Sequence, residues 1–527
     1  MFRIDYNRAC ILHARPCANR SRTKRQIWNH SRRLLASCLV LSTSLVGTTA
    51  MAGLPAFPGA EGAGALAVGG RGGDVCKVTN LNDSGPGSLR ACVERSGPRT
   101  VVFEVGGTIE LQTHLRFRDP FITVAGQTAP GGGIQLKSAA DNPRGLIVIN
   151  TREVVIRYLR VRRGTTGYKS DTIRITDTDG QLVENIIFDH VSSFWSENQN
   201  WSINGRREGT APRNITLQNS ILAEPIGGRV QGLITPSDSV EAALAMSNID
   251  MHNNFLTNSR HRNPSFQVDS GRFVNNIVYH ATNWWSRFGT GSHVDLIGNK
   301  YKRGPEKPGS RGQTELHFME YHPEMRNAHE KIQRFENLYY VVGNWGEMSG
   351  MRPDTDNWPY TRMVPGYTGS NMNASPGGVP PEAWRRYEPL PAVGSPITIR
   401  HVDQLEDYLF PIVGASRRLD CGGNWVFNRD AADARVIEEY MNFGGVVSPS
   451  HENDVGGFPQ IAGGSPCVDT SGDGIPDEWA IAHGFDPVDS SLGRSVHESG
   501  YTYLEIYLGG VQLNTARPAE PSGVRVE

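Results

Sequence analysis

Two arginines and a histidine stand side by side near the middle of this chain and carry its clearest chemical signal. They are Arg260, His261 and Arg262, and Pro264 completes an Arg-x-Pro element two residues after Arg262. A guanidinium group offers paired N–H donors that match a carboxylate, so Arg260 and His261 are candidates for holding an acidic substrate. Arg262 belongs to the same cationic element. The alternative for Arg262 is a surface arginine that only fixes a turn.

An acidic loop near the C-terminus has the composition of a metal site. Its expected ligands occupy alternate positions: Asp469, Ser471, Asp473, Ile475 and Asp477. Oxygen-bearing residues spaced in this way around a glycine wrap a hard cation, and calcium is the expected ion. Ala480 stands where a complete EF-hand carries glutamate, so we expect a shorter calcium loop with a structural role. A solvated acidic turn is the alternative.

The elements that must position these residues are short β-strands. Apolar residues alternate in brief runs from about Val101 to Lys302, without helical periodicity between them. Such runs, at a spacing of roughly 22 to 34 residues, are typical of the coils of a parallel β-helix. Asparagines recur at 253–254, 275–276 and 299, and stacked asparagine side chains bond along such a helix. We predict an all-β fold of this type, with peripheral loops and with short flanking helices near 402–413 and 431–440. A β-sandwich is the alternative.

Composition limits the partners of this chain. It has 527 residues, 38% of them hydrophobic, and a formal net charge of −1. This balance gives no reason to expect nucleic acid or an anionic membrane as a partner. It remains compatible with a local basic groove for an acidic substrate. We expect a monomer.

Both ends of the chain read as segments outside the main domain. A basic stretch, an apolar run at 34–46 and small residues at 50 and 52 predict a signal peptide over residues 1–52. The protein is therefore expected to be secreted or periplasmic, in a bacterium, and not bound to a membrane once the signal is removed. The remaining divisions are a β-helix domain at 53–466 with its C-terminal loops and helices, the calcium loop segment at 467–490, and a tail at 491–527.

Four cysteines lie beyond the expected signal peptide: Cys76, Cys92, Cys421 and Cys467. An even number in an exported chain favours disulfides. Cys76 and Cys92 form the most local pair, so we predict a disulfide between them. The pairing of the other two is left open.

Three segments resemble the opening signatures of the pectate lyases of polysaccharide lyase family one. They are FPGAEG at 57–62, TNLNDSGPGSLR at 79–90 and AGQTAPG at 125–131, and the resemblance extends to about Pro487. It implies a right-handed parallel β-helix and the cleavage of pectate by β-elimination. The family removes the proton at C5 of galacturonate, and calcium between enzyme and substrate carboxylates acidifies that proton.

The resemblance also implies roles for individual residues. The family places an arginine base two residues before a proline, after a strand that ends in His-Asn-Asn. Arg262 matches this position, because it precedes Pro264 by two residues and follows the His-Asn-Asn sequence at 252–254. Arg260 and His261 are then expected to bind the substrate carboxylate. An arginine is an unusual base because it normally stays protonated, so neighbouring cations and desolvation must disfavour its charged form.

The same resemblance assigns active-site metal ligands, with one departure. Asp171 lies in the expected Asp-x-Ile element, and Glu197 and Asn198 follow the expected Asp-His-x-Ser block. Relatives of this subgroup often carry adjacent aspartate and glutamate where this chain has Asn198 and Gln199. Amide oxygens supply no charge, so calcium should bind more weakly here, or Glu197 must take over.

Two other functions remain open from the sequence. A β-helical glycoside hydrolase acting on pectin needs two carboxylates across one bond, and Asp171, Asp189 and Glu197 are available. A non-catalytic, uronate-binding β-helix is the other possibility. A lyase leaves a conjugated double bond in its product, whereas a hydrolase does not.

Overall fold

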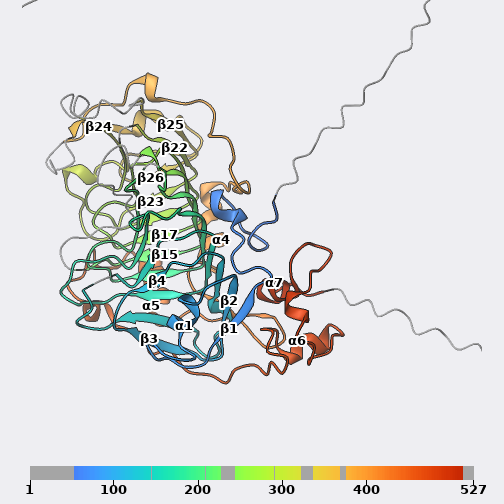
Figure 1. Ribbon diagram of the computed structural model, residues 1–527. Coiled ribbons are helices and arrows are strands. Elements are labelled where there is room, and N and C mark those ends of the chain that lie inside the picture. Colours follow the sequence, from blue (N-terminus) through green and yellow to red (C-terminus); the bar gives the residue numbers. More distant parts are fainter. Residues whose placement is uncertain are drawn as a thin grey trace, which may run out of the picture. The chain divides into compact units, whose positions relative to one another are not determined.

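The fold is a right-handed parallel β-helix, as the sequence predicts. The computed structural model describes residues 53–143, 145–207, 209–226, 244–289, 291–321, 336–367 and 375–513. The expected signal peptide and the last part of the expected tail, at 514–527, lie outside the described residues. The described residues from Gly53 to Leu513 form one compact unit. Figure 1 shows its strands stacked from β1 and β3 at one end to β24 and β25 at the other.

Three parallel sheets form the sides of the helix, and the chain visits them in turn. Among the described residues, sheet I has ten strands: β1 (Asp74–Val78), β2 (Arg99–Phe103), β5 (Ile122–Ala125), β8 (Val154–Arg157), β11 (Glu184–Asp189), β14 (Arg213–Gln218), β16 (Ser247–His252), β19 (Ser270–Val274), β22 (His293–Ile297) and β25 (Leu338–Val342). Sheet II has nine strands: β3 (Gly107–Leu111), β6 (Ile134–Ser138), β9 (Arg160–Arg162), β12 (Ser192–Phe194), β15 (Ile221–Ala223), β17 (Phe255–Thr257), β20 (Ile277–Tyr279), β23 (Lys300–Lys302) and β26 (Trp345–Gly346).

Sheet III is described in two parts of four strands each. The first part contains β4 (Leu115–Phe117), β7 (Ile147–Ile149), β10 (Ile173–Thr176) and β13 (Trp201–Asn204). The second contains β18 (Ser265–Phe266), β21 (Ser286–Phe288), β24 (Leu316–Tyr321) and β27 (Arg362–Tyr367). One coil therefore runs from sheet I through sheet II to sheet III. Expected site residues fall in the turns from sheet II to sheet III.

The core is built by equivalent residues on successive coils. In sheet I, Ile156 aligns with Phe188, Phe188 with Leu217, and Leu217 with Met251. All four are buried. Because alternate side chains of a strand point to opposite faces, one inward column of this kind fixes the register of each coil on the next.

An asparagine ladder joins the turns between sheets I and II. The side-chain oxygen of Asn276 accepts hydrogen bonds from the backbone and side-chain amides of Asn254, each at 3.0 Å. Asn299 relates in the same way to Asn276, and Asn344 to Asn299. This confirms the structural role expected for these asparagines, which satisfy buried backbone donors where the chain bends.

The family-like segment 57–62 leads into a buried contact on sheet I. Directly after it, η1 (Ala63–Leu66) lies against β11, β14 and β16. The backbone amides of Ala63 and Gly64 donate to Asp250 at 2.7 Å and to Thr216 at 2.9 Å. A Cβ on Gly64 would lie 2.2 Å from the carbonyl oxygen of Ile186. Only glycine permits this approach, so the residues directly after segment 57–62 have a structural role.

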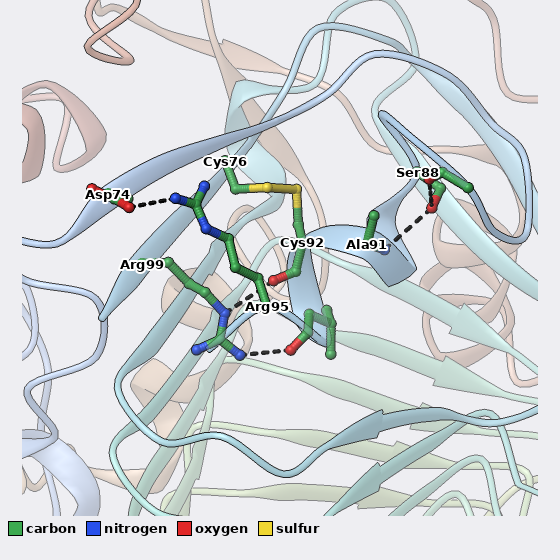
Figure 2. The surroundings of a disulfide bond; sticks show 9 residues. Asp74, Cys76, Ser88, Ala91, Cys92, Arg95 and Arg99 are labelled. Carbon is green, nitrogen blue, oxygen red and sulfur yellow. Dashed lines mark hydrogen bonds and ion pairs between the residues drawn. A yellow bond between two sulfur atoms is a disulfide. The ribbon is translucent and has the colours of Figure 1, made fainter. Parts of the chain in front are cut away.

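The disulfide between Cys76 and Cys92 is present, as predicted. It joins β1 to helix α1 (Leu89–Val93), whose N-terminus is capped by Ser88. Arg99 donates to the carbonyl oxygens of Cys92 at 3.0 Å and Val93 at 2.6 Å at the other end of the helix (Figure 2). A second disulfide pairs Cys421 with Cys467, which resolves the pairing left open by the sequence.

Helices near the C-terminus cover sheet II. They include α4 (Leu405–Leu409) and α5 (Ala431–Met441), which confirm the helices expected near 402–413 and 431–440. Arg162 of β9 is fully buried and pairs with Asp430 and Asp433 of this segment, each at 2.8 Å. These ion pairs attach the C-terminal segment that contains α5 to the outer face of sheet II.

The segment expected as a tail at 491–527 is folded over its first part. Helix α7 (Tyr503–Leu508) places Leu504 and Tyr507 in one apolar cluster with Ile475 and with Trp479 of α6 (Asp477–Ala482). The boundary expected at residue 491 is therefore not a packing boundary, because the loop segment and residues 491–513 share a core.

The remaining elements are a hairpin and short helical turns. Strands β28 (Arg417–Leu419) and β29 (Trp425–Phe427) pair antiparallel. The further 3-10 turns are η2 (Gly126–Thr128), η3 (Ser310–Gly312), η4 (Trp358–Tyr360), η5 (Glu382–Trp384), η6 (Val402–Gln404), η7 (Glu452–Val455) and η8 (Leu492–Arg494). In the described part of the chain, every helix is too short or too polar to cross a lipid bilayer.

Candidate active site

The turn that carries Arg262 connects β17 to β18, and the next coil holds its backbone. The amides of Arg262 and Asn263 donate to the carbonyl oxygens of Trp284 at 3.0 Å and Trp285 at 2.6 Å. Arg262 has a φ of +67°, a conformation that non-glycine residues adopt only where the surroundings impose it. The position of this arginine is thus set by the fold and not by a free loop.

The three expected residues of this turn differ in exposure. Arg260 is exposed, Arg262 is half-buried, and His261 is only 7% exposed. Burial, together with the positive charges of nearby arginines including Arg262, Arg287 and Arg260, holds the pKa of His261 well below its usual range. Its Nδ1 has no hydrogen-bond partner among the described residues. Of the two expected carboxylate contacts, only Arg260 is accessible to a polymer.

Asp171 and Asn198 meet in neighbouring turns, before β10 and β13. The side-chain amide of Asn198 donates to Oδ1 of Asp171 at 2.7 Å. Oδ2 of the same carboxylate accepts from Ser202 at 2.7 Å and from the guanidinium of Arg174 at 2.8 Å. Asp171 is 1% exposed, so its charge is neutralised inside the protein by Arg174.

Glu197 is held beside this pair by a second arginine. It forms an ion pair with Arg163 at 3.2 Å and accepts the backbone amide of Gly167 at 2.7 Å. Arg163 is fully buried, and desolvation lowers its pKa against the opposing attraction of Glu197 and Asp171. The structure therefore brings Asp171, Glu197 and Asn198 together, with both carboxylates already engaged by arginines and hydrogen-bond donors.

This arrangement does not fit the calcium ion expected here. Both carboxylates are charge-paired with arginines, and the amide nitrogen of Asn198, not its oxygen, faces Asp171. The described residues contain no group of three or more His, Cys, Asp or Glu side chains in a metal-holding arrangement. A cation at this point would have to compete with Arg174 and Asn198 for the carboxylate of Asp171, so we derive no catalytic step through calcium.

The acidic turns and the Arg262 turn lie along one edge of the helix. They follow β9, β12 and β17 of sheet II, and these strands are linked through β15 in continuous parallel pairing. At a strand spacing of about 4.8 Å, the Arg262 turn lies roughly 10 Å from the Glu197 turn and roughly 14 Å from the Asp171 turn. The site residues predicted from separate motifs are therefore on the same edge of the protein.

The acidic C-terminal loop lies elsewhere, beside β1. Asp469 pairs with Lys77 at 3.0 Å and accepts the backbone amides of Gly472 and Gly474, each at 2.8 Å. Asp473 accepts the amides of Ile475 at 3.0 Å and Gly493 at 2.7 Å. Ser471 donates to Asp469, and Asp477 accepts from Thr470. The carboxylates face backbone amides and do not converge on one point.

Sequence reasoning missed the arginines that complete the site. The signal was present in Arg160, Arg162 and Arg163, which place three cations in and just after an otherwise apolar strand. It was also present in Arg174, three residues after Asp171. Nothing local identified Glu439, whose carboxylate contacts Asn258 at the start of the Arg262 turn at 2.7 Å.

Comparison with known proteins assigns the family. No family model matches the chain. “Probable pectate lyase C” of Aspergillus fumigatus is 32% identical over 480 residues, which cover 88% of this chain and 96% of the relative. The protein of the same name from Aspergillus flavus is 32% identical over 487 residues, covering 90% and 96%, and that from Emericella nidulans is 32% identical over 459 residues, covering 86% and 92%. The chain belongs to the pectate lyase family.

This membership confirms the resemblance carried by the sequence motifs. Solved structures similar to this lyase include Jun a 1, the major allergen from cedar pollen, with a TM-score of 0.45 and 14% identity over 67% of this chain and 92% of that one. Another is pectate lyase Bsp165PelA from Bacillus sp. N165 in complex with trigalacturonate, with a TM-score of 0.40 and 14% identity over 67% and 98%. The curated relatives named above are fungal, so they give no support to the expected bacterial source.

Proposed function

We propose that this lyase cleaves pectate by β-elimination and that Arg262 is the base. The guanidine of Arg262 takes the proton from C5 of a galacturonate unit, the electron pair forms the C4–C5 double bond, and the C4–O bond to the next sugar breaks. The observation behind this assignment is the fixed backbone of the Arg262 turn. The amide of Arg262 donates to the carbonyl oxygen of Trp284 on the next coil at 3.0 Å. A rigid base retains its orientation toward the bond it attacks.

Positive charge around the turn supports this chemistry. The elimination develops negative charge on the substrate carboxylate, and preorganised cations stabilise such charge. Arg260 is exposed beside Arg262 and is the proposed partner of that carboxylate. Arg287 adds a further positive charge close to His261 of the same turn.

Calcium is proposed only for the C-terminal loop, in a structural role. The support is the alternation of Asp469, Ser471, Asp473, Ile475 and Asp477 with glycines of positive φ between them. Binding requires these carboxylates to turn away from their amides, and Asp469 to leave Lys77. Calcium should raise the melting temperature of the wild type and have little effect on Asp473→Asn; equal shifts in both proteins would rule out this loop.

We further propose that the protein is secreted. The signal-like segment at 1–52 supports this, and so do the two disulfides, which persist in oxidising compartments.

The test of the proposed function is the chemistry of the product. Purified protein incubated with polygalacturonate should generate the ultraviolet absorbance of a conjugated, unsaturated uronate, and Arg262→Ala should not. New reducing ends without that absorbance would identify a hydrolase. Binding without turnover would identify a non-catalytic lectin-like protein. The hydrolase alternative has lost one candidate carboxylate, because Asp189 is buried in an ion pair with Arg157 on sheet I at 2.9 Å.

A further inference from the structure

A cleft of about 500 Å³ opens beside the Arg262 turn, on the side of the later coils. Its lining includes Arg260, Asn283, Glu306, Lys307, Val447 and Ser448. The hydroxyl oxygen of Ser448 is buried there without a hydrogen-bond partner among the described residues. The cleft thus presents polar groups that a ligand can engage.

Three successive turns contribute to the lining of this cleft. Arg260 follows β17, Asn283 follows β20, and Lys307 follows β23, and these strands pair in parallel one after another. They are turns of the same edge that carries Arg262, Asp171 and Glu197. At about 4.8 Å per strand, the Lys307 turn lies roughly 10 Å beyond the Arg260 turn. A chain-like ligand lying along the edge therefore passes from Arg262 into the cleft.

The cleft carries two exposed cations. Arg260 and Lys307 are both exposed, and neither forms an ion pair with a described residue. One acid, Glu306, also lines the cleft, but its carboxylate accepts the backbone amide of Val447 at 2.9 Å. Two cations against one carboxylate give the cleft a net positive charge, which suits a ligand with repeated carboxylates.

The loop that presents Lys307 is anchored at both sides. The backbone amide of Glu306 donates to Nε2 of the buried His280 at 3.2 Å. The amide of Gly309 donates to the carbonyl oxygen of Thr282 at 2.9 Å. Lys307 lies between these two contacts, so its backbone is held while its side chain remains exposed.

We propose that this cleft is an additional binding subsite for an acidic polysaccharide, in which Lys307 pairs with the carboxylate of a sugar unit away from the bond that is cleaved, beyond the unit held by Arg260. The proposal rests on the proposed function, which places the reacting unit at Arg262. It makes recognition depend on chain length and on free carboxylates, because a short or esterified oligomer cannot reach or pair with Lys307.

The test compares Lys307→Ala, Lys307→Glu and Lys307→Arg on oligogalacturonates from trimer to hexamer and on the polymer. An exposed ion pair contributes up to about 1 kcal/mol, which corresponds to roughly a fivefold change in KM. For Lys307→Ala the rise in KM should grow with oligomer length and reach about fivefold on the polymer. The charge reversal should exceed it, and Lys307→Arg should restore most of the affinity.

Arg213→Ala is the matched control, because Arg213 is an exposed cation on β14 of sheet I. It should bind and turn over every oligomer as the wild type does. A Lys307→Ala effect that is absent, or equal for trimer and polymer, would overturn the subsite. Calorimetry of polymer binding to Arg262→Ala, with and without Lys307→Ala, separates the two proposals. A wild type that yields no unsaturated product refutes the proposed reaction. Weaker polymer binding by the double variant than by Arg262→Ala still supports the proposed subsite.

Discussion

The side-chain amide of Asn258 donates to the carboxylate of Glu439 at 2.7 Å, and this contact joins helix α5 to the turn that carries Arg262. Asn258 is the first residue of that turn and has a φ of +53°. Its oxygen also faces Nδ1 of His280 at 3.0 Å. A helix far along the chain therefore fixes the point at which the Arg262 turn leaves sheet II.

Replacing Glu439 should affect turnover through this contact. In Glu439→Ala we expect kcat to fall several-fold with a smaller change in KM, because Arg262 loses its orientation while Arg260 remains exposed. Glu439→Gln keeps an oxygen acceptor for Asn258 and should recover most of kcat, although it weakens the ion pair with Arg435. If both variants lose only thermal stability, Glu439 supports the fold and does not position the turn.

The ion pairs of Asp171 and Glu197 give a prediction about metal removal. Because Arg174 and Arg163 already neutralise these carboxylates, a chelator should leave most of the elimination activity in place at low temperature. Arg174→Ala exposes an unpaired carboxylate at Asp171 and should make the remaining activity respond to added calcium. Complete loss of wild-type activity in chelator, with recovery on adding calcium alone, would contradict this account.

The sequence predicted what repeats along the chain. Alternating apolar residues gave the strands, the asparagines at 253–254, 275–276 and 299 gave the ladder, and the short separation of Cys76 and Cys92 gave their disulfide. Each of these depends on neighbours within one or two coils. Local spacing is therefore enough to determine them.

The contacts between the C-terminal helix α5 and sheet II could not be predicted from local spacing. Asn258 and Glu439 are 181 positions apart, and Arg162 and Asp433 are 271 apart. Their meeting depends on how α5 crosses sheet II, which no local pattern specifies. The ion pair of Glu197 with Arg163 likewise depends on the exact path of a turn. The sequence alone therefore could not show that arginines neutralise the carboxylates of the expected calcium site.

Buried histidines should make the fold sensitive to acid, and His280 offers the clearest case. Burial lowers the pKa of His280 from 6.5 to about 4. Between these values the unfolded chain binds a proton that the folded chain does not, so stability is lost as the pH falls through this interval, by about 1.4 kcal/mol per pH unit. Protonation of Nε2 also removes the acceptor for the amide of Glu306.

His280→Asn tests this dependence, because asparagine tolerates the φ of +55° at this position. Denaturant unfolding of wild type and variant at pH 7, 6, 5 and 4 should show a shallower loss of stability in the variant. The difference between the two proteins isolates His280 from the other titrating groups. Parallel curves would show that His280 keeps an ordinary pKa in the folded protein.

The strongest prediction concerns Arg262. If its guanidine takes the proton from C5, Arg262→Ala and Arg262→Lys should both fold normally and lose kcat by roughly 10²- to 10⁴-fold, the usual contribution of a general base. Lysine keeps the positive charge but not the planar group, so a shared loss separates proton transfer from charge alone. Arg260→Ala should mainly raise KM, because it removes a contact to the substrate carboxylate and leaves the base.

Formation of unsaturated product, followed by its absorbance, measures all three variants, and melting temperatures confirm that they are folded. Arg260 and Arg262 belong to one turn yet differ in exposure. Arg260 is open to solvent, whereas Arg262 is half-buried and its amide donates to the carbonyl oxygen of Trp284. Near-normal product formation by Arg262→Ala would place the base elsewhere on this edge. An Arg262→Lys variant that retains most of its kcat would show that position 262 supplies charge and not proton transfer.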